Sequence, residues 1–188
     1  MFGKLPVGSM LRRLPIIAML TMVSCAENVR PVPVEELPSS AAIVECQNAI
    51  DHRNNVDSID YTKIHDVVLL ATSKSASTAL QVARLESSGL FGKTGLLVRR
   101  NSRVELRVPE EFADEVLVGW GGTNDTDHIV VGPCSSEAEW LVFAGGYVVE
   151  RVGCFDITVR SRSEQTTVSM GIGAPCPGQE PPPQPSAS

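Results

Sequence analysis

The chain has 188 residues, of which 43% are hydrophobic, and its formal net charge at neutral pH is −6. Beyond residue 24 it carries 13 basic and 22 acidic residues, and so acidic a chain is not expected to bind nucleic acid or to dock electrostatically on anionic lipid. About 160 residues suffice for one folded domain with its own hydrophobic core.

The first 24 residues have the features of an export signal. Three basic residues precede an almost wholly apolar run at residues 14–23, and residues 24–26 are small. The apolar run has about half of the roughly 20 residues that a membrane-spanning helix needs. The segment is therefore predicted to be a cleaved signal peptide rather than a permanent transmembrane helix.

Residues 22–25, Met-Val-Ser-Cys, resemble the lipobox of bacterial lipoproteins. The resemblance implies that residues 1–24 are removed and that Cys25 receives a diacylglyceryl group on its sulfur. Acyl chains, each contributing about 0.8 kcal/mol per buried methylene, would then hold the protein on the extracytoplasmic face of the cell membrane. Residues 24–26 also fit the small-x-small rule for cleavage after Ala26, which would release a secreted, soluble protein.

Proline-rich segments flank the central region of the chain. Residues 25–43 are rich in proline and are predicted to form an extended tether. Residues 177–188 are also proline-rich and are predicted to be a disordered tail, because proline cannot complete a strand ladder. The folded domain is therefore predicted over residues 44–176.

Short apolar segments follow one another through this domain. Residues 41–50 and 77–87 fit a short helix and a strand about equally well. Residues 103–108 alternate between charged and apolar side chains, which predicts a half-buried strand that ends at Pro109. Shorter apolar runs bounded by turn residues predict further strands at residues 66–71, 95–99, 116–120, 129–131, 140–144 and 147–150.

The last part of the domain predicts a hairpin. Residues 155–160 and 167–172 each alternate between apolar and polar side chains, and a polar turn at residues 161–164 separates them. With eight or nine short strands in all, the sequence predicts an all-β fold: a single antiparallel β-sandwich, Ig-like or jelly-roll-like.

The cysteines predict a disulfide framework. Four remain once Cys25 is set aside, namely Cys46, Cys134, Cys154 and Cys176. An even set in an exported chain is most simply two disulfides. No C-x-x-C pair occurs and the three histidines are scattered, so no zinc site, other metal or cofactor is predicted.

The glycine pair Gly145-Gly146 bears on the disulfide pairing, because two glycines between apolar runs predict a tight hairpin turn. Such a turn would bring Cys134 close to Cys154 and favours Cys134–Cys154 with Cys46–Cys176. The hairpin over residues 155–172 makes Cys176 the rival partner of Cys154.

Residues 119–128 form the candidate binding loop. An aromatic ring among glycines, followed by carboxylates, an amide and an imidazole, could stack on a sugar ring or hold a calcium ion. An ordinary connecting loop with the tryptophan in the core is the favoured interpretation, because Ile129 and Val130 stand where a calcium loop needs a ligand and a glycine. The candidate residues are Trp120, Asn124, Asp125, Asp127 and His128.

No catalytic residues are predicted. The chain lacks G-x-S-x-G, S-x-x-K and H-E-x-x-H, although a site assembled from separated loops would leave no such motif. The sequence therefore favours a non-catalytic envelope module that binds a protein, a glycan or a small ligand. The alternative is an extracytoplasmic enzyme, hydrolase-like, with a site built from distant loops.

Three stretches carry a wider resemblance. Residues 91–99 (FGKTGLLVR), 140–147 (WLVFAGGY) and 171–178 (GIGAPCPG) resemble uncharacterised secreted or lipid-anchored proteins of actinobacteria. The resemblance covers residues 90–178 and depends on short stretches of similar sequence rather than on a motif of known mechanism. It implies an envelope location and no particular activity.

Overall fold

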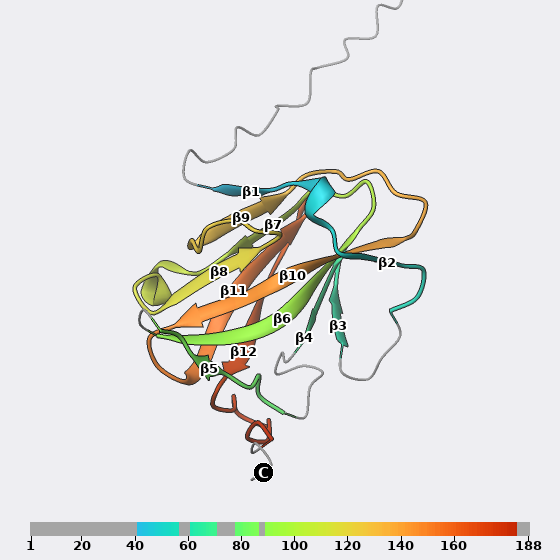
Figure 1. The fold of residues 1–188 in the computed structure, drawn as a ribbon. Coiled ribbons are helices and arrows are strands. Elements are labelled where there is room, and N and C mark those ends of the chain that lie inside the picture. The colour runs from blue at the N-terminus through green and yellow to red at the C-terminus, as the bar shows by residue number, and fades with distance from the viewer. Residues whose placement is uncertain (1–40, 57–60, 71–77, 87–88, 184–188) are drawn as a thin grey trace, which may run out of the picture. The chain divides into compact units, whose positions relative to one another are not determined.

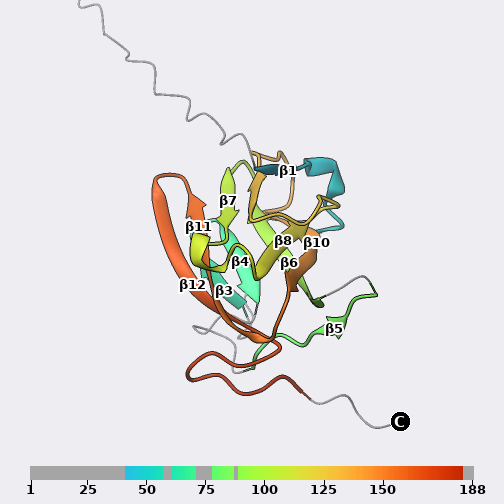
Figure 2. The same ribbon diagram turned by 90° about the vertical axis from the view of Figure 1, so that its left-hand side faces the viewer.

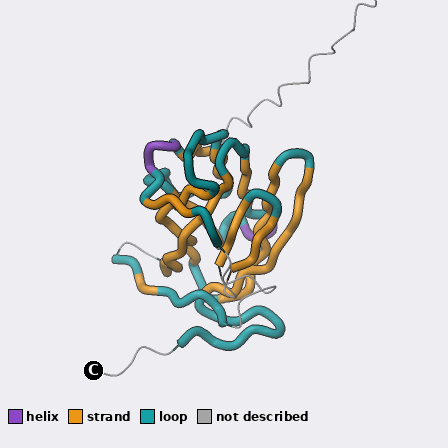
Figure 3. Tube along the Cα trace, turned by 90° about the vertical axis from the view of Figure 1, so that its right-hand side faces the viewer, coloured by secondary structure: helices purple, strands orange, loops and turns teal. Residues whose placement is uncertain are grey.

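A computed structural model describes residues 41–56, 61–70, 78–86 and 89–183. In these residues two β-sheets pack together, and Figure 1 shows their strands in chain order. Figure 2 shows the two layers from the side, and Figure 3 shows how little helix accompanies them. The predicted all-β sandwich with disulfides is confirmed. The predicted signal peptide, Cys25 and most of the predicted tether lie outside the described residues.

The first sheet has the strand order β1-β9-β7-β11-β12. Strand β1 runs parallel to β9, and the other neighbours are antiparallel. In the β11–β12 hairpin, Ser161 pairs with Glu164 around a two-residue turn, which confirms the predicted hairpin. The bounds are β1 Ala42–Val44, β7 Val104–Arg107, β9 His128–Val131, β11 Gly153–Ser161 and β12 Glu164–Ile172.

The second sheet has the order β2-β10-β6-β4-β3, with β5 also paired to β6 and β8 also paired to β10. All of its pairs are antiparallel. The bounds are β2 Asp51–Arg53, β3 Tyr61–Ile64, β4 Val67–Leu70, β5 Ala83–Arg84, β6 Leu90–Arg99, β8 Val116–Trp120 and β10 Trp140–Val149. Two 3₁₀ turns accompany the sheets, η1 Cys46–Asn48 and η2 Glu110–Phe112. The ambiguous residues 41–50 therefore hold both a strand and a 3₁₀ turn, and the described part of residues 77–87 holds the short strand β5.

The hydrophobic core lies between the two sheets. On β7, Val104 and Leu106 are fully buried, whereas Glu105 is half-buried and Arg107 is exposed. This is the pattern expected of a strand with one face on the core and one in water. Each such aliphatic side chain stabilises the fold by roughly 1.5–3 kcal/mol relative to its exposed state.

The glycine pair Gly145-Gly146 lies inside a strand rather than in a turn, so the hairpin predicted there is wrong. Strand β10 continues without a break and pairs with β6 along its whole length. A Cβ added at Gly145 would lie 2.0 Å from the carbonyl oxygen of Gly119 on β8. A Cβ added at Gly146 would lie 2.1 Å from the carbonyl oxygen of Gly92 on β6. The two glycines therefore permit the close approach of the flanking strands.

The disulfides are Cys46–Cys134 and Cys154–Cys176. All four cysteines are paired as expected, but the favoured pairing of Cys134 with Cys154 is wrong because β10 does not fold back at its glycines. Strands β1 and β9 end side by side, with Val44 opposite Val131. Cys46 follows shortly after the end of β1 and Cys134 shortly after the end of β9, so the two cysteines lie close enough to form a disulfide.

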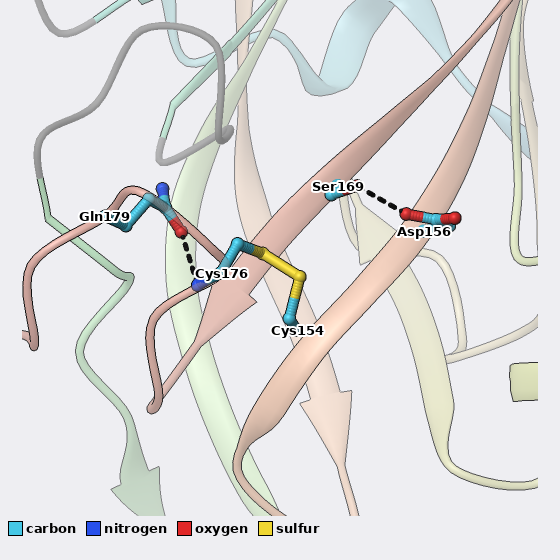
Figure 4. The surroundings of a disulfide bond; sticks show 5 residues. All are labelled: Cys154, Asp156, Ser169, Cys176 and Gln179. Carbon is cyan, nitrogen blue, oxygen red and sulfur yellow. Dashed lines mark hydrogen bonds between the residues drawn. A yellow bond between two sulfur atoms is a disulfide. The ribbon is translucent and has the colours of Figure 1, made fainter.

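The rival pair forms because β12 returns along β11 and leaves Cys176 beside Cys154 (Figure 4). The chain beyond this disulfide also bonds back to the domain. The Cys176 N–H donates to Gln179 Oε1 over 3.0 Å, and the Ala79 N–H donates to the Glu180 carbonyl over 2.9 Å. The disordered tail predicted from residue 177 is therefore placed too early, because these bonds hold the first residues beyond the predicted boundary.

Candidate functional site

The aromatic member of the candidate binding loop points into the core. Trp120 is 1% exposed, and its Nε1–H donates to the Thr94 carbonyl over 3.1 Å. Its ring meets the ring of Tyr147 edge-on, with centroids 5.1 Å apart. The favoured interpretation of a core tryptophan is confirmed, and this ring is not available to stack on a sugar.

The polar members of the loop are spread over several environments. Asn124 and Asp125 are exposed, Asp127 is half-buried and His128 is buried at the start of β9. Asp125 Oδ1 lies 2.7 Å from where a Cβ at Gly119 would be, so a larger residue there would require this exposed side chain to turn away. No group of three or more His, Cys, Asp or Glu side chains within the described ranges is placed to hold a metal ion.

His128 is 3% exposed and faces Glu105 on the neighbouring strand β7. Its Nε2 lies 3.8 Å from Glu105 Oε2 and has no hydrogen-bond partner among the described residues. Burial has the largest effect and lowers the pKa of His128, while the negative charge of Glu105 acts in the opposite direction. We therefore expect a neutral imidazole at pH 7.

Acid is expected to destabilise the domain through His128. Because its pKa in the folded state lies below the ordinary value of 6.5, the unfolded chain binds the proton more readily, and stability falls as pH drops below that value. Urea unfolding of the wild type should show this loss, by at most about 1.4 kcal/mol per pH unit. The His128→Gln variant should lack it, and His52→Gln, at an exposed position, should retain it. If the free energy of unfolding depended on pH in the same way for the wild type and for His128→Gln, the acid sensitivity would not come from His128.

The described cluster that comes nearest to catalytic chemistry joins the two sheets. We call it the inter-sheet clasp: His65 and Asp66 in the β3–β4 turn meet Ser161, Arg162 and Glu164 around the β11–β12 turn. Asp66 accepts hydrogen bonds from Ser161 Oγ at 2.9 Å and from Arg162 Nε at 2.8 Å. His65 Nδ1 lies 2.6 Å from Glu164 Oε2.

The clasp lacks the pairing that activates a serine nucleophile. That chemistry needs a hydroxyl within hydrogen-bonding reach of a general base. Ser161 instead donates to the carboxylate of Asp66, while the second ring nitrogen of His65 lies 2.9 Å from Thr166 Oγ1. In the part of the chain that the structure describes, no serine hydroxyl bonds to a histidine ring. Thr166 does place a hydroxyl beside His65, whose other ring nitrogen meets Glu164, so the clasp ties the two sheets together and also contains one hydroxyl–imidazole–carboxylate row.

Replacing Asp66 should weaken this tie. Burial raises the pKa of Asp66, but hydrogen bonds from Ser161 and Arg162 and the charge of Arg162 outweigh it, so the pKa is lowered. Asp66→Asn is expected to reduce the free energy of unfolding at pH 7 by about 2 kcal/mol. The difference in the free energy of unfolding between the wild type and Asp66→Asn should shrink as pH falls below about 3.8, where the Asp66 carboxyl of the unfolded chain takes up its proton. Urea unfolding at pH 7 and pH 3 tests this, with the exposed Glu137→Gln as control; an equal difference at both pH values would contradict it.

A groove at the end of β8 and β10 has a volume of about 600 Å³. Gly89, residues 113–115, Leu117 and residues 148–150 line it, and we call it the acidic groove. A second cavity of about 460 Å³ lies beside His52. A third, of about 440 Å³, lies beside the candidate binding loop and is lined by Gly121, Gly122 and the exposed Ile50, among others. The acidic groove is in the size range of ligand sites.

The floor of the acidic groove is apolar. Leu117 on β8 lies directly opposite Val148 on β10, and both side chains are half-buried. They project from the outer face of the sheet, since their neighbours Val118 and Val149 belong to the core. The two side chains therefore form a small aliphatic patch on the paired strands β8 and β10, whose ribbons lie side by side in Figure 1.

One wall of the groove follows the 3₁₀ turn η2. Phe112 at the end of this turn packs edge-on against Phe155 of the core, with ring centroids 5.7 Å apart. The Glu115 N–H then donates to the Phe112 carbonyl over 2.9 Å. This compact turn holds Asp114 and Glu115 beside the floor. On another side Gly89 adopts a φ of +82°, which favours glycine, and brings its turn close to Val149.

The charges of the groove are negative. Asp114 and Glu150 are exposed, and neither side chain makes an ion pair or a hydrogen bond with a described residue. Glu115 pairs with Arg151, whose guanidinium lies 5.4 Å over the ring of Phe155. The arrangement offers an apolar floor and two carboxylates without a partner.

Sequence reasoning did not find this groove. Its residues come from three separate places in the chain, and each is an ordinary acidic or aliphatic residue. The pairing of β8 with β10 brings them together, and that pairing was hidden by the turn predicted at Gly145-Gly146.

Comparison with protein-family models, with curated proteins and with solved structures found no match to this chain. Within the described ranges, no helix is long and apolar enough to cross a membrane.

Proposed function

We propose that this protein is a non-catalytic, lipid-anchored binding module on the extracytoplasmic face of the cell membrane, with the acidic groove as its ligand site. The observation that carries the proposal is the groove itself. Its volume, its apolar floor and its few polar groups are the properties of a binding site. The unpaired carboxylates would supply orientation and specificity.

Two disulfides support the extracytoplasmic part of the proposal, because such bonds persist in oxidising compartments and are rare in the cytosol. The lipobox-like residues 22–25 support a lipid anchor at Cys25. Cleavage after Ala26 is the alternative, and it would leave the same binding domain in secreted form. The resemblance over residues 90–178 supports either envelope location.

The described geometry favours binding over hydrolysis. The inter-sheet clasp contains a hydroxyl–imidazole–carboxylate row of Thr166, His65 and Glu164, but none of these residues lines any of the three cavities described above. The described residues that line the acidic groove include no serine, cysteine or histidine. As far as the described lining goes, its carboxylates have apolar neighbours and no nucleophile beside them, which suits recognition of a ligand.

The anchor can be tested by growing expressing cells with a labelled palmitate analogue. The wild type should take up the label and sediment with membranes, because Cys25 is lipidated. Cys25→Ala should lose the label, whereas Cys46→Ala, which also removes one cysteine, should keep it. An unlabelled wild-type protein in the culture medium would contradict the anchor and favour secretion.

A further inference from the structure

We infer that the acidic groove receives lysine or arginine side chains from a basic, apolar segment of a partner protein. The inference rests on the proposed binding function and names the chemistry of the ligand.

The floor of the groove suits the stem of a long basic side chain. Lysine and arginine bury their methylene groups on apolar surface while their charged heads stay at a polar edge. Leu117 and Val148 provide such a surface, and both keep part of it open to solvent. A ligand with aliphatic groups beside its charges would cover both side chains.

The rim of the groove suits the cationic head. Asp114 and Glu150 line the groove where the β8–β10 ladder ends, with the Glu150 N–H donating to the Glu115 carbonyl over 3.0 Å, and neither has an ion-pair partner among the described residues. The protein already shows the same chemistry once, because Arg151 pairs with Glu115 while lying over Phe155. A cationic side chain of the partner would form ion pairs with the two remaining carboxylates.

The net charge of the chain points to a basic protein partner. With 13 basic and 22 acidic residues beyond residue 24, the domain attracts cationic surfaces over a distance, which raises association rates. A small polyamine would pair with the carboxylates, but its unbranched methylene spacers would cover less of the aliphatic floor than leucine and valine side chains would. A peptide with alternating basic and apolar side chains satisfies both.

The test uses the mature, disulfide-bonded protein and synthetic peptides measured by calorimetry. One peptide alternates lysine with leucine and valine, a second has glutamine in place of lysine, and a third has serine in place of the apolar residues. The first should bind most tightly. Asp114→Asn combined with Glu150→Gln should weaken its binding about five- to tenfold, since each exposed ion pair contributes modestly. Glu45→Gln combined with Glu137→Gln changes the net charge equally at exposed positions and should leave binding within about twofold.

Several results would overturn the inference. One is that the first peptide binds the groove variant as tightly as the control variant, and another is that the three peptides bind the wild type equally tightly. A third is that the wild type binds none of the peptides, and a fourth is that it binds spermidine as tightly as the first peptide. If the protein is nonetheless processed and disulfide-bonded, the proposed envelope function stands and only its ligand is wrong. If the protein keeps its first 24 residues and free thiols, the proposed function fails whatever the peptides do.

Discussion

Removal of the Cys46–Cys134 disulfide by paired alanine substitutions is expected to lower the free energy of unfolding by about 4.5 kcal/mol, as the chain-entropy model gives for a loop of this length. The two cysteines lie 88 residues apart in the sequence, so the cross-link strongly restricts the unfolded chain. Urea unfolding of the mature domain under non-reducing conditions measures the loss.

The Cys154–Cys176 pair is the matched comparison. Its sequence separation is 22 residues, and its removal should cost less, about 3.5 kcal/mol in the same model. A larger loss for the shorter loop would contradict the entropic account. It would mean instead that the contacts of the chain beyond β12, such as the bond from Ala79 to Glu180, depend on that disulfide.

Replacing Gly145 by alanine is expected to destabilise the domain by about 3 kcal/mol or more, as overpacking in a close-packed interior does. The added methyl would meet the Gly119 carbonyl oxygen and the Trp120 Cα atom, so β8 would have to move away from β10. Equilibrium unfolding in urea is the measurement.

Gly132→Ala is the control for this substitution. A Cβ at Gly132 would meet no atom within 4 Å, so its effect should stay within about 0.5 kcal/mol, as for most surface changes. A small effect at Gly145 as well would contradict the uninterrupted β10 and favour the tight turn that its glycines alone suggest.

The parts of the fold that the sequence predicts well are those encoded locally. The alternation over residues 103–108 specifies a strand with one buried face and one solvent-facing face, and β7 has this burial pattern. The hairpin of β11 and β12 is encoded by two alternating stretches around a polar turn. In both cases the strand is specified by residues that are neighbours in the chain, and its signature is an alternation of apolar and polar side chains with a period of two.

The parts that the sequence did not predict depend on contacts between distant segments. A glycine pair has the same local preferences in a tight turn and in a crowded strand. Its role at residues 145 and 146 is decided by the approach of β8 and β6 from elsewhere in the chain. The disulfide pairing was wrong for the same reason, since it depends on β1 lying parallel to β9.

The candidate site shows the same division. Burial of Trp120 could be favoured from the sequence because an aromatic residue at the end of an apolar run usually belongs to the core. The acidic groove could not be predicted, because Asp114 and Glu150 become neighbours only through strand pairing. Nothing in the local sequence marks either carboxylate as unpaired.

The central claim is that an anchored, two-disulfide binding module lies outside the cytoplasm, and an intact mass tests it most directly. The protein is purified from its native host without reductant and weighed before and after reduction. The account predicts an acylated chain that begins at Cys25 and gains four hydrogens on reduction, two for each disulfide. A lipid-free chain that begins at Glu27 would contradict the anchor, and a mass unchanged by reduction would contradict the disulfide framework.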